Sequence, residues 1–368
     1  MSTWFSTAAV LGKLRADWVL SDNQASWLTI VVQLGFVAGA ILSATTNLAD
    51  RIRPLRLVFA GSLGAAAANG LVTIFDRYGP ALLLRFVTGA CLAAVYPPAL
   101  KAMSAWYRTG RGFALGVMIG ALTAGSALPH LLNAIGGVGW KLTLLSASLL
   151  TVLGGVLVES FGVAGPYGAA SAPFDPSQLG KIVQDRKFRL ASIGYFGHMW
   201  ELYAMWAWIA AFYSDVLGST RKASFVAFAV ISTGAAGSMY AGVVSNRRTN
   251  SDAAIQALRW SGAIALFVGF LVDAPDPLVI GVGLVWGFWV VADSAQFSTI
   301  VTNTCPPAYV GTALTIQLAA GFVLTVFTIF LVPVVRDAAG WGWAFFMLAP
   351  GPAAGAWAMS QLRPMDAG

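Results

Sequence analysis

Long apolar runs dominate the sequence and constrain its fold more than any other feature. Most are about 20 residues long, and short polar connections separate them. About 20 apolar residues are what an α-helix needs to cross the ~30 Å hydrocarbon core of a bilayer. Of the 368 residues 58% are apolar and 10% are charged, whereas soluble domains have about 45–50% and about 25%. These values exclude a soluble enzyme, and we expect an all-α membrane protein.

Glycine, proline and charged residues divide the chain into twelve expected spans, the first one short. They cover residues 1–14, 26–48, 54–75, 80–102, 112–134, 142–160, 190–213, 223–244, 252–272, 277–300, 309–334 and 340–360. We expect one six-helix bundle over residues 1–161 and a second over residues 190–368. We expect the connection at 162–189 to be a cytoplasmic linker. Its segment from Gln178 is either a short amphipathic helix on the inner membrane surface or a plain solvated linker.

The basic residues indicate the orientation. The loops after spans two, four, six and eight, together with the C-terminal tail, hold thirteen Lys and Arg residues, whereas the opposite loops hold seven. Because basic loops stay in the cytoplasm, both termini are expected to face inward from a cytoplasmic (inner) membrane. The net charge of +7 therefore reflects topology rather than nucleic-acid binding. Cys91 and Cys305 indicate no disulfide framework.

The two halves repeat each other. Asn47-Leu-Ala-Asp50-Arg51 and Val243-Val-Ser-Asn246-Arg247 close spans two and eight, and Gly112-Phe-Ala-Leu115 and Gly311-Thr-Ala-Leu314 open spans five and eleven. Ala25-Ser26-Trp27 likewise matches Ala223-Ser224-Phe225, 198 positions later. Matches in the same order at similar offsets indicate a parallel duplication of six-span units, which is a transporter architecture.

At this point the sequence resembles the major facilitator superfamily (MFS). Thr46-Asn-Leu48-Ala-Asp50-Arg51-Ile-Arg53-Pro-Leu-Arg56 is similar to that family's loop signature Gly-x-Leu-Ala-Asp-Arg-x-Gly-Arg-Arg, and it departs from the signature at Thr46 and Arg53, where glycine is usual. Arg85-Phe-Val-Thr-Gly89 in span four looks like the family's Arg-x-x-x-Gly motif. The resemblance implies two rocking bundles, with a cavity lined by spans one, four, seven and ten.

The family's antiporter signature, a Gly-Pro pair followed by Gly-Gly in span five, is not reproduced at Gly116–Gly125. This disfavours drug/proton antiport. Small residues spaced four apart also allow close helix packing in lipid, whatever the substrate is.

Ionisable residues inside spans are candidates for function because a charge at the bilayer centre costs about 2.5–3.5 kcal/mol. In span seven, His198, Glu201, Met205 and Trp208 share one helical face. We expect the His198 imidazole beside the Glu201 carboxylate, where the pair takes up and releases a proton. The alternative is a hydrogen-bonded pair that ties span seven to its neighbour.

In span ten, Trp286, Trp289 and Asp293 share a face with Gln296. Two indoles and a carboxylate suit a cavity wall for an amphipathic or ring-bearing solute. Helix packing or a gate salt bridge is the alternative for Asp293.

Arg85 and His130 are the other two ionisable residues that we consider as candidates. The Arg85 guanidinium either binds an anionic substrate or Glu201, or holds backbone carbonyls of span one. His130 follows Pro129 near the outer end of span five, where we expect a pore-rim or water-exposed position.

The resemblance also implies a conformational latch in the loops that close spans two and eight. Asp50 meets the N-terminus of a neighbouring helix, and Arg51 meets a carboxylate, which holds the outward-open state. Asn246 and Arg247 form the degenerate second copy. None of these residues is expected to bind substrate.

The expected function is secondary active transport of a small organic solute by alternating access. Proton-coupled symport of an organic anion is the first hypothesis, and efflux of hydrophobic or aromatic compounds by drug/proton antiport is the alternative. The partners are a small-molecule substrate, the proton and the lipid bilayer, and the protein is expected to be monomeric, with no cofactor, metal or nucleic acid. The sequence has no His-Glu-x-x-His and no Gly-x-Ser-x-Gly, so an enzyme is not expected.

The short first span leads to one more expectation. About 14 residues cover only about 21 Å at 1.5 Å each, less than the bilayer core. Comparison of Met1 with Met205 suggests that this sequence begins inside its first helix, through a misplaced start or a truncation.

Overall fold

The computed structural model describes residues 1–46, 48–107, 111–136, 139–167, 177, 179–306 and 310–366, which are almost entirely helical and include no strand. The first half contains α1 (Ser6–Ala9), α2 (Leu11–Trp18), α3 (Asp22–Thr45), α4 (Leu48–Arg51), α5 (Pro54–Phe75), α6 (Tyr78–Leu92), α7 (Tyr96–Ser104), α8 (Arg111–Gly136) and α9 (Trp140–Phe161). After α10 (Leu179–Gln184), the second half contains α11 (Arg186–Leu217), α12 (Thr220–Arg247), α13 (Asn250–Ala265), the 3₁₀ turn η2 (Val268–Leu271), α14 (Asp276–Ala292), α15 (Ser294–Thr304), α16 (Val310–Phe346) and α17 (Pro350–Asp366).

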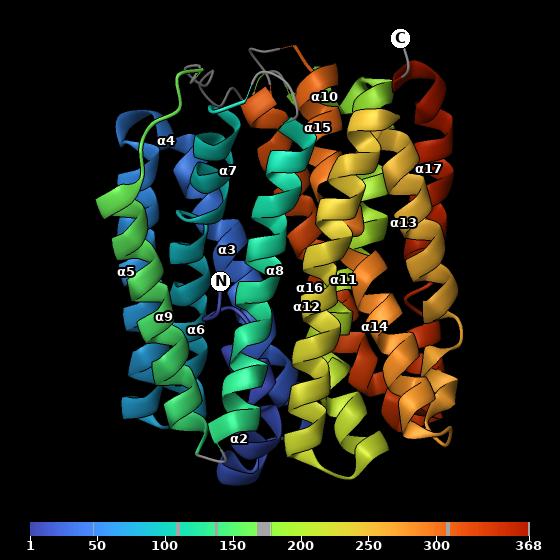
Figure 1. Cartoon of the computed structure of the whole chain (residues 1–368). Coiled ribbons are helices and arrows are strands. Elements are labelled where there is room, and N and C mark those ends of the chain that lie inside the picture. Colours follow the sequence, from blue (N-terminus) through green and yellow to red (C-terminus); the bar gives the residue numbers. More distant parts are fainter. Residues whose placement is uncertain are drawn as a thin grey trace.

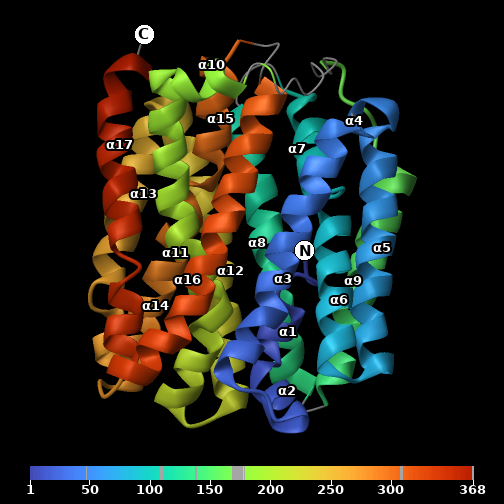
Figure 2. The same ribbon diagram turned by 180° about the vertical axis from the view of Figure 1, so that it is seen from behind.

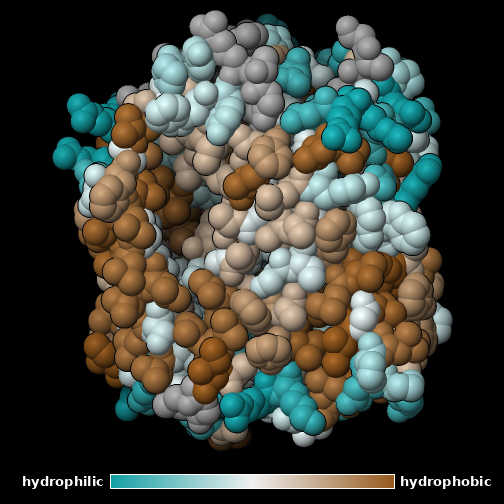
Figure 3. Space-filling view, viewed as in Figure 1, coloured by the Kyte–Doolittle hydropathy of each residue, from teal (hydrophilic) through white to brown (hydrophobic). Residues whose placement is uncertain are grey.

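The long helices stand roughly parallel in two groups, one from each half of the chain (Figures 1 and 2). One end of the bundle carries α4, α10 and the C-terminus, and we call it the linker face; the end that carries α2 is the opposite face. Apolar side chains form a belt around the middle, and hydrophilic ones gather at both ends (Figure 3). This is the surface expected of a protein that spans a membrane.

The helices follow the twelve expected crossings, with corrections at several ends. Span two begins at Asp22 rather than residue 26, because Ser21 and Gln24 form a capping box there. The polar run at residues 17–23 is therefore divided between the end of α2 and the start of α3, and the turn between them covers only residues 19–21, where Val19 adopts a left-handed conformation. Spans eleven and twelve meet at Gly340, whose φ of 84° breaks the helical path between them.

Eight described helices are long and apolar enough to cross a membrane. One of them, Val310–Met365, contains both of the last two crossings. Spans one, seven and nine are not among the eight, and α13 has only 16 residues before the chain turns toward η2. Span seven, in α11, carries the His198 and Glu201 side chains, both buried within the protein.

The duplication is visible in the closest helix contacts. A side chain on Gly39 would meet the carbonyl of Ala90, and one on Gly237, 198 positions later, would meet the carbonyl of Phe288. Gly89 lies against Val32 in the same way as Gly287 lies against Val230, again 198 positions on. Spans two and four therefore approach each other as spans eight and ten do, with glycine at the contact because no larger residue fits.

The glycines of span five also serve helix packing. A side chain on Gly116 would meet the Ser238 carbonyl at 2.6 Å, and one on Gly120 would meet the Ala235 carbonyl at 3.0 Å. Both contacts join α8 to α12, across the boundary between the halves. Packing against α12 therefore explains this glycine spacing.

We predict that Gly89→Ala destabilises the protein, because the new methyl group would lie 2.0 Å from the Val32 carbonyl oxygen. Overpacking of this kind costs about 1–3 kcal/mol or more. Gly154→Ala is the matched control, since nothing lies within 4 Å of a side chain at that position. Thermal unfolding in detergent should show a lower midpoint for Gly89→Ala only; equal midpoints would contradict the contact.

Candidate functional site

A small enclosed space lies between the two halves. Its walls come from α7, α8, α11, α14, α15 and α16, and the room left for water-sized molecules is about 40 Å³. The lining includes the ring side chains of Tyr96, Tyr195, His198, Tyr203, Trp206 and Phe322, the hydroxyl side chains of Thr123, Ser294 and Ser298, and the aliphatic side chains of Ile119, Leu122, Met199, Leu202, Val291 and Leu318. No Lys or Arg is among these described lining residues, so the cavity is aromatic and mostly uncharged.

Two helix breaks meet at this cavity. Span four stops at Leu92 and restarts at Tyr96, because Pro97 and Pro98 suit the first turn of a new helix and not the interior of an old one. Span ten breaks at Asp293, which ends α14 and precedes Ser294, the first residue of α15. Tyr96 and Ser294 both line the cavity, and they are 198 positions apart, so the breaks occupy equivalent places in the two halves.

The break in span ten brings Asp293 to His198. Asp293 Oδ1 lies 2.7 Å from His198 Nδ1, and both side chains are almost fully buried. The other ring nitrogen, Nε2, lies 3.0 Å from the Ser294 hydroxyl oxygen. The carboxylate, imidazole and hydroxyl groups therefore lie in a row that ends at the cavity wall, and groups of these kinds can exchange protons.

Glu201 has a different partner from the one expected. Its Oε1 accepts a 2.7 Å hydrogen bond from Trp286 Nε1, whereas the His198 ring lies against Asp293 and Ser294. The spacing in span seven does place Glu201 one turn from His198, but it cannot show which neighbouring helix supplies the stronger partner. Glu201 is 1% exposed and has no cationic partner among the described residues.

The predicted tryptophans lie around the cavity rather than in its wall. Trp286 is buried against Glu201 and Phe345, and Trp208 donates to the Ile329 carbonyl. Trp289 stacks on Trp260. None of the three contributes to the lining described above.

Trp206 was missed by sequence reasoning. It lines the cavity, and its Nε1–H is buried without a partner among the described residues. The helical face chosen from the sequence passed through Trp208, two residues away, and only the neighbouring helices decide which indole meets the cavity.

Arg85 does not reach the cavity lining. Its guanidinium donates to the carbonyls of Leu28, Thr3 and Trp4 and to Asn69 Oδ1, at 3.2 Å for Leu28 and 2.6 Å for Thr3. Of the two roles expected, this is the structural one, since the side chain anchors the first residues of the chain to α3 and α5. It leaves little donor capacity for a substrate anion.

His130 does not lie at a water-exposed rim. Its side chain is fully buried in α8, and neither ring nitrogen has a partner among the described residues. Pro129 lies inside α8 rather than at its end, and the helix continues to Gly136, so the expectation placed His130 too close to the end of its helix.

A salt-bridge cluster joins the halves at the opposite face. Arg336 of α16 contacts Asp22 of α3 at 2.8 Å, and Arg15 of α2 pairs with the same carboxylate. The Arg336 guanidinium also lies over the rings of Trp341 and Trp208, at 5.4 and 6.0 Å. From the sequence, Arg336 is only one of the basic residues in a loop. Its ion pair could not be predicted, because its partner Asp22 is 314 positions away.

Comparison with known proteins agrees with this architecture. The family model described as Major Facilitator Superfamily matches residues 1–316. The chain belongs to the major facilitator superfamily. No curated protein matches its sequence.

One solved structure with the same fold is that of the xylose transporter XylE from E. coli, in a partially occluded inward open conformation. The TM-score is 0.76 at 12% sequence identity, over 98% of this chain and 93% of that one. At this identity the similarity shows the fold. The chain is thus a multi-pass membrane protein with a secondary transporter's architecture.

The MFS loop signature is partly described. The side chain of Asp50 lies outside the described residues, and Arg51 is exposed at the end of α4. In the second copy, Asn246 and Arg247 are exposed in the last turn of α12, and Asn246 lies next to Gly112 at the start of α8. The second copy therefore lies where the two halves meet at the linker face.

The described residues include no group of three or more His, Cys, Asp and Glu side chains that could hold a metal ion.

Proposed function

We propose that this MFS protein is a proton-coupled secondary transporter that takes up a small organic acid by alternating access. Its two bundles, residues 1–161 and 190–368, would rock about the cavity, with the linker at 162–189 and both termini in the cytoplasm. One observation carries the proposal: helix breaks in equivalent positions of the two halves flank one cavity. Such paired breaks mark the binding site in duplicated transporters.

The proton pathway we propose uses His198, Asp293 and Glu201. His198 touches both the cavity and the Asp293 carboxylate, so a proton on the ring is shared between the substrate side and the protein side. Glu201, one turn along α11, is a buried carboxylate without a cation beside it, and a bound proton would remove the cost of its charge. Substrate binding at His198 can therefore alter where the proton resides.

The substrate's acidic group would be held by donors that have spare capacity. Arg85 was the first candidate for this role, but its bonds to backbone carbonyls leave Trp206 Nε1 as the better candidate. The indole N–H has no partner among the described residues, whereas both ring nitrogens of His198 already face Asp293 and Ser294. The aromatic walls would hold the apolar part of the molecule. The missing antiporter signature supports uptake with protons, which is symport.

The aromatic lining also favours a second candidate function, efflux of hydrophobic or ring-bearing compounds by drug/proton antiport. Tyr195, Tyr203, Trp206 and Phe322 present flat apolar surfaces to the cavity. Because a xylose transporter has the same fold, a neutral sugar is a third substrate class to test. The three substrate classes are separable in one transport assay.

In this conformation the two halves are joined at the opposite face. The Arg336–Asp22 contact and the Asn133–Ser224 hydrogen bond close the opposite face between the halves, and the enclosed volume is small. In the outward-open state these contacts would separate, and the loop residues Asp50, Arg51, Asn246 and Arg247 would form the latch at the linker face.

We predict that Glu201→Gln abolishes proton-driven accumulation but retains substrate exchange, because a neutral amide mimics the protonated carboxyl group. Proteoliposomes with an inward proton gradient, tested with radiolabelled monocarboxylates, xylose and a cationic dye, would identify the substrate and measure both activities. Glu159→Gln is the matched control, since Glu159 lies on the surface with Arg56.

Each result of this assay has a definite meaning. Carboxylate uptake that rises with the gradient supports the proposal, whereas dye movement driven in the opposite direction supports efflux. Unchanged accumulation in Glu201→Gln would remove Glu201 from the mechanism, and loss of exchange as well would assign it to binding or structure.

For the substrate contact, we predict that Trp206→Phe raises KM about tenfold or more, because it removes one N–H donor to an anionic group. Trp208→Phe removes an equivalent N–H that bonds to the Ile329 carbonyl outside the cavity. Its KM should stay close to that of the parent. Equal KM values for the two variants would show that the Trp206 indole N–H does not bind the substrate.

A further inference from the structure

An apolar groove runs along the outer wall of the second half, between α13 and α17. Its volume is about 440 Å³, within the ~300–1,000 Å³ of typical ligand pockets. Figures 1 and 2 show both helices at the edge of the molecule, far from the cavity between the halves. The groove exists because small side chains face each other across it, namely Gly262, Ala263, Ala349, Ala353 and Ala356.

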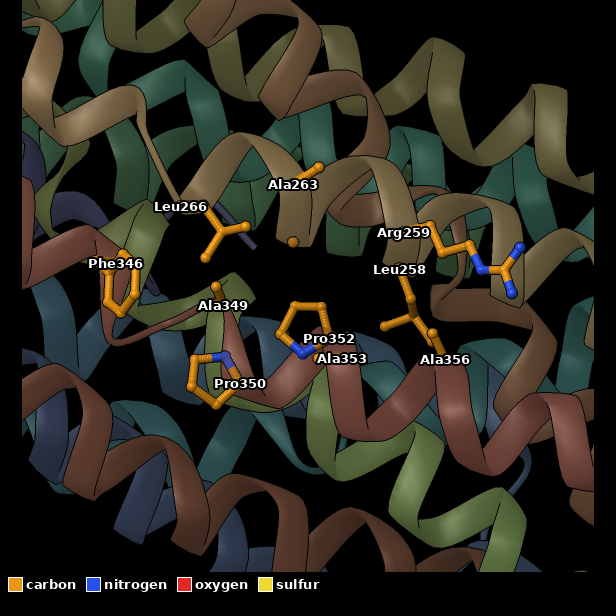
Figure 4. A pocket seen from close by; sticks show the side chains of 11 residues that line it. Leu258, Arg259, Ala263, Leu266, Phe346, Ala349, Pro350, Pro352, Ala353 and Ala356 are labelled. Atoms are coloured by element: carbon orange, nitrogen blue, oxygen red, sulfur yellow. The ribbon is translucent and has the colours of Figure 1, made fainter.

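The two ends of the groove differ in chemistry. Leu266 and Phe346 form one end, and Arg259 lies at the other, with its guanidinium pointing away from the apolar side chains (Figure 4). Arg259 lies on α13 and Leu266 directly follows that helix, seven residues later, which is about 10 Å along its axis. The groove is therefore shaped for a molecule with a long apolar part and an anionic end.

Arg259 has no anionic partner among the described residues. Its side chain is exposed on the outer surface, and it has no hydrogen bond or ion pair among the described residues. It lies nine residues inside α13 from Asn250, about 14 Å from the start of that helix. At this depth a guanidinium on the lipid-facing surface finds its partners by extending toward the lipid head groups.

Neighbouring side chains indicate that head groups lie at this level. Trp260 is 53% exposed and stacks on Trp289, and Tyr240 is 40% exposed and bonds with Gln256 through its hydroxyl. Tryptophan and tyrosine with one apolar and one polar end are typical of the membrane–water interface. These neighbours favour a position for the Arg259 guanidinium near the lipid phosphates.

We propose that the groove binds an anionic phospholipid of the surrounding bilayer, with one acyl chain against Gly262, Ala353 and Leu266 and the phosphate at Arg259. The charge of Arg259 and the apolar lining complement the two parts of that molecule. This site is independent of the transport function proposed above.

The test measures the thermal unfolding midpoint of purified protein in neutral detergent with added dioleoyl phosphatidylglycerol or dioleoyl phosphatidylcholine. The parent should be stabilised more by the anionic lipid. Arg259→Gln should lose this difference, whereas Arg248→Gln, which changes an exposed arginine away from the groove, should keep it. Ala263→Leu should weaken the stabilisation by filling the groove, and Ala354→Leu, on an exposed position outside the lining, should not.

Native mass spectrometry of the same samples identifies the occupant. One retained phosphatidylglycerol in the parent, lost in Arg259→Gln and in Ala263→Leu, supports the proposal. Equal lipid retention by Arg259→Gln and the parent would overturn it. So would a dimer that Ala263→Leu disrupts, since a second copy of the chain would then cover the groove.

Discussion

A polar side chain inside a bilayer must find its partners within the protein, and this constraint organises the structure. Arg85 meets it with backbone carbonyls: the first residues of the chain are not helical, so the carbonyls of Thr3 and Trp4 are free to accept its N–H groups. Asn69 completes the set and extends it to Ser6 and Ser148. The cation thus anchors span one to its neighbours. Because its N–H groups are already bonded within the first half, we look for substrate contacts in the second half.

The second half meets the same constraint with groups that can exchange a proton. Asp293 and His198 lie at the break of span ten, and Glu201 lies one turn from His198. The break is the counterpart of the interruption at Ala93–Val95 in span four, where two prolines end one helix and begin another. The duplication therefore produced two equivalent breaks, and only the second contains a carboxylate. This asymmetry places the buried ionisable side chains on one side of the cavity, in the second half, and mostly aromatic and hydroxyl groups elsewhere in its lining.

The fold was predictable from the sequence because apolar length and the repeated loop patterns depend on local spacing. The MFS resemblance and the twelve crossings both follow from such local signals. The partners of the site residues did not, since they join helices far apart in the chain: His198 contacts Asp293, Glu201 contacts Trp286, and Asp22 contacts Arg336. Helical periodicity also failed to distinguish Trp206 from Trp208, because every face of α11 is buried by a different neighbour.

The proposed proton pathway is tested most directly by asking whether protonation of the His198–Asp293 pair changes the arrangement of the two halves. Spin labels at Asn23→Cys and Thr220→Cys, after replacement of Cys91 and Cys305, report the distance between the halves across the opposite face. Pulsed electron paramagnetic resonance should show two distance populations whose ratio changes with pH. In the His198→Gln/Asp293→Asn variant the ratio should no longer change. The same pH response in that variant, or a single pH-independent population in the parent, would contradict the account.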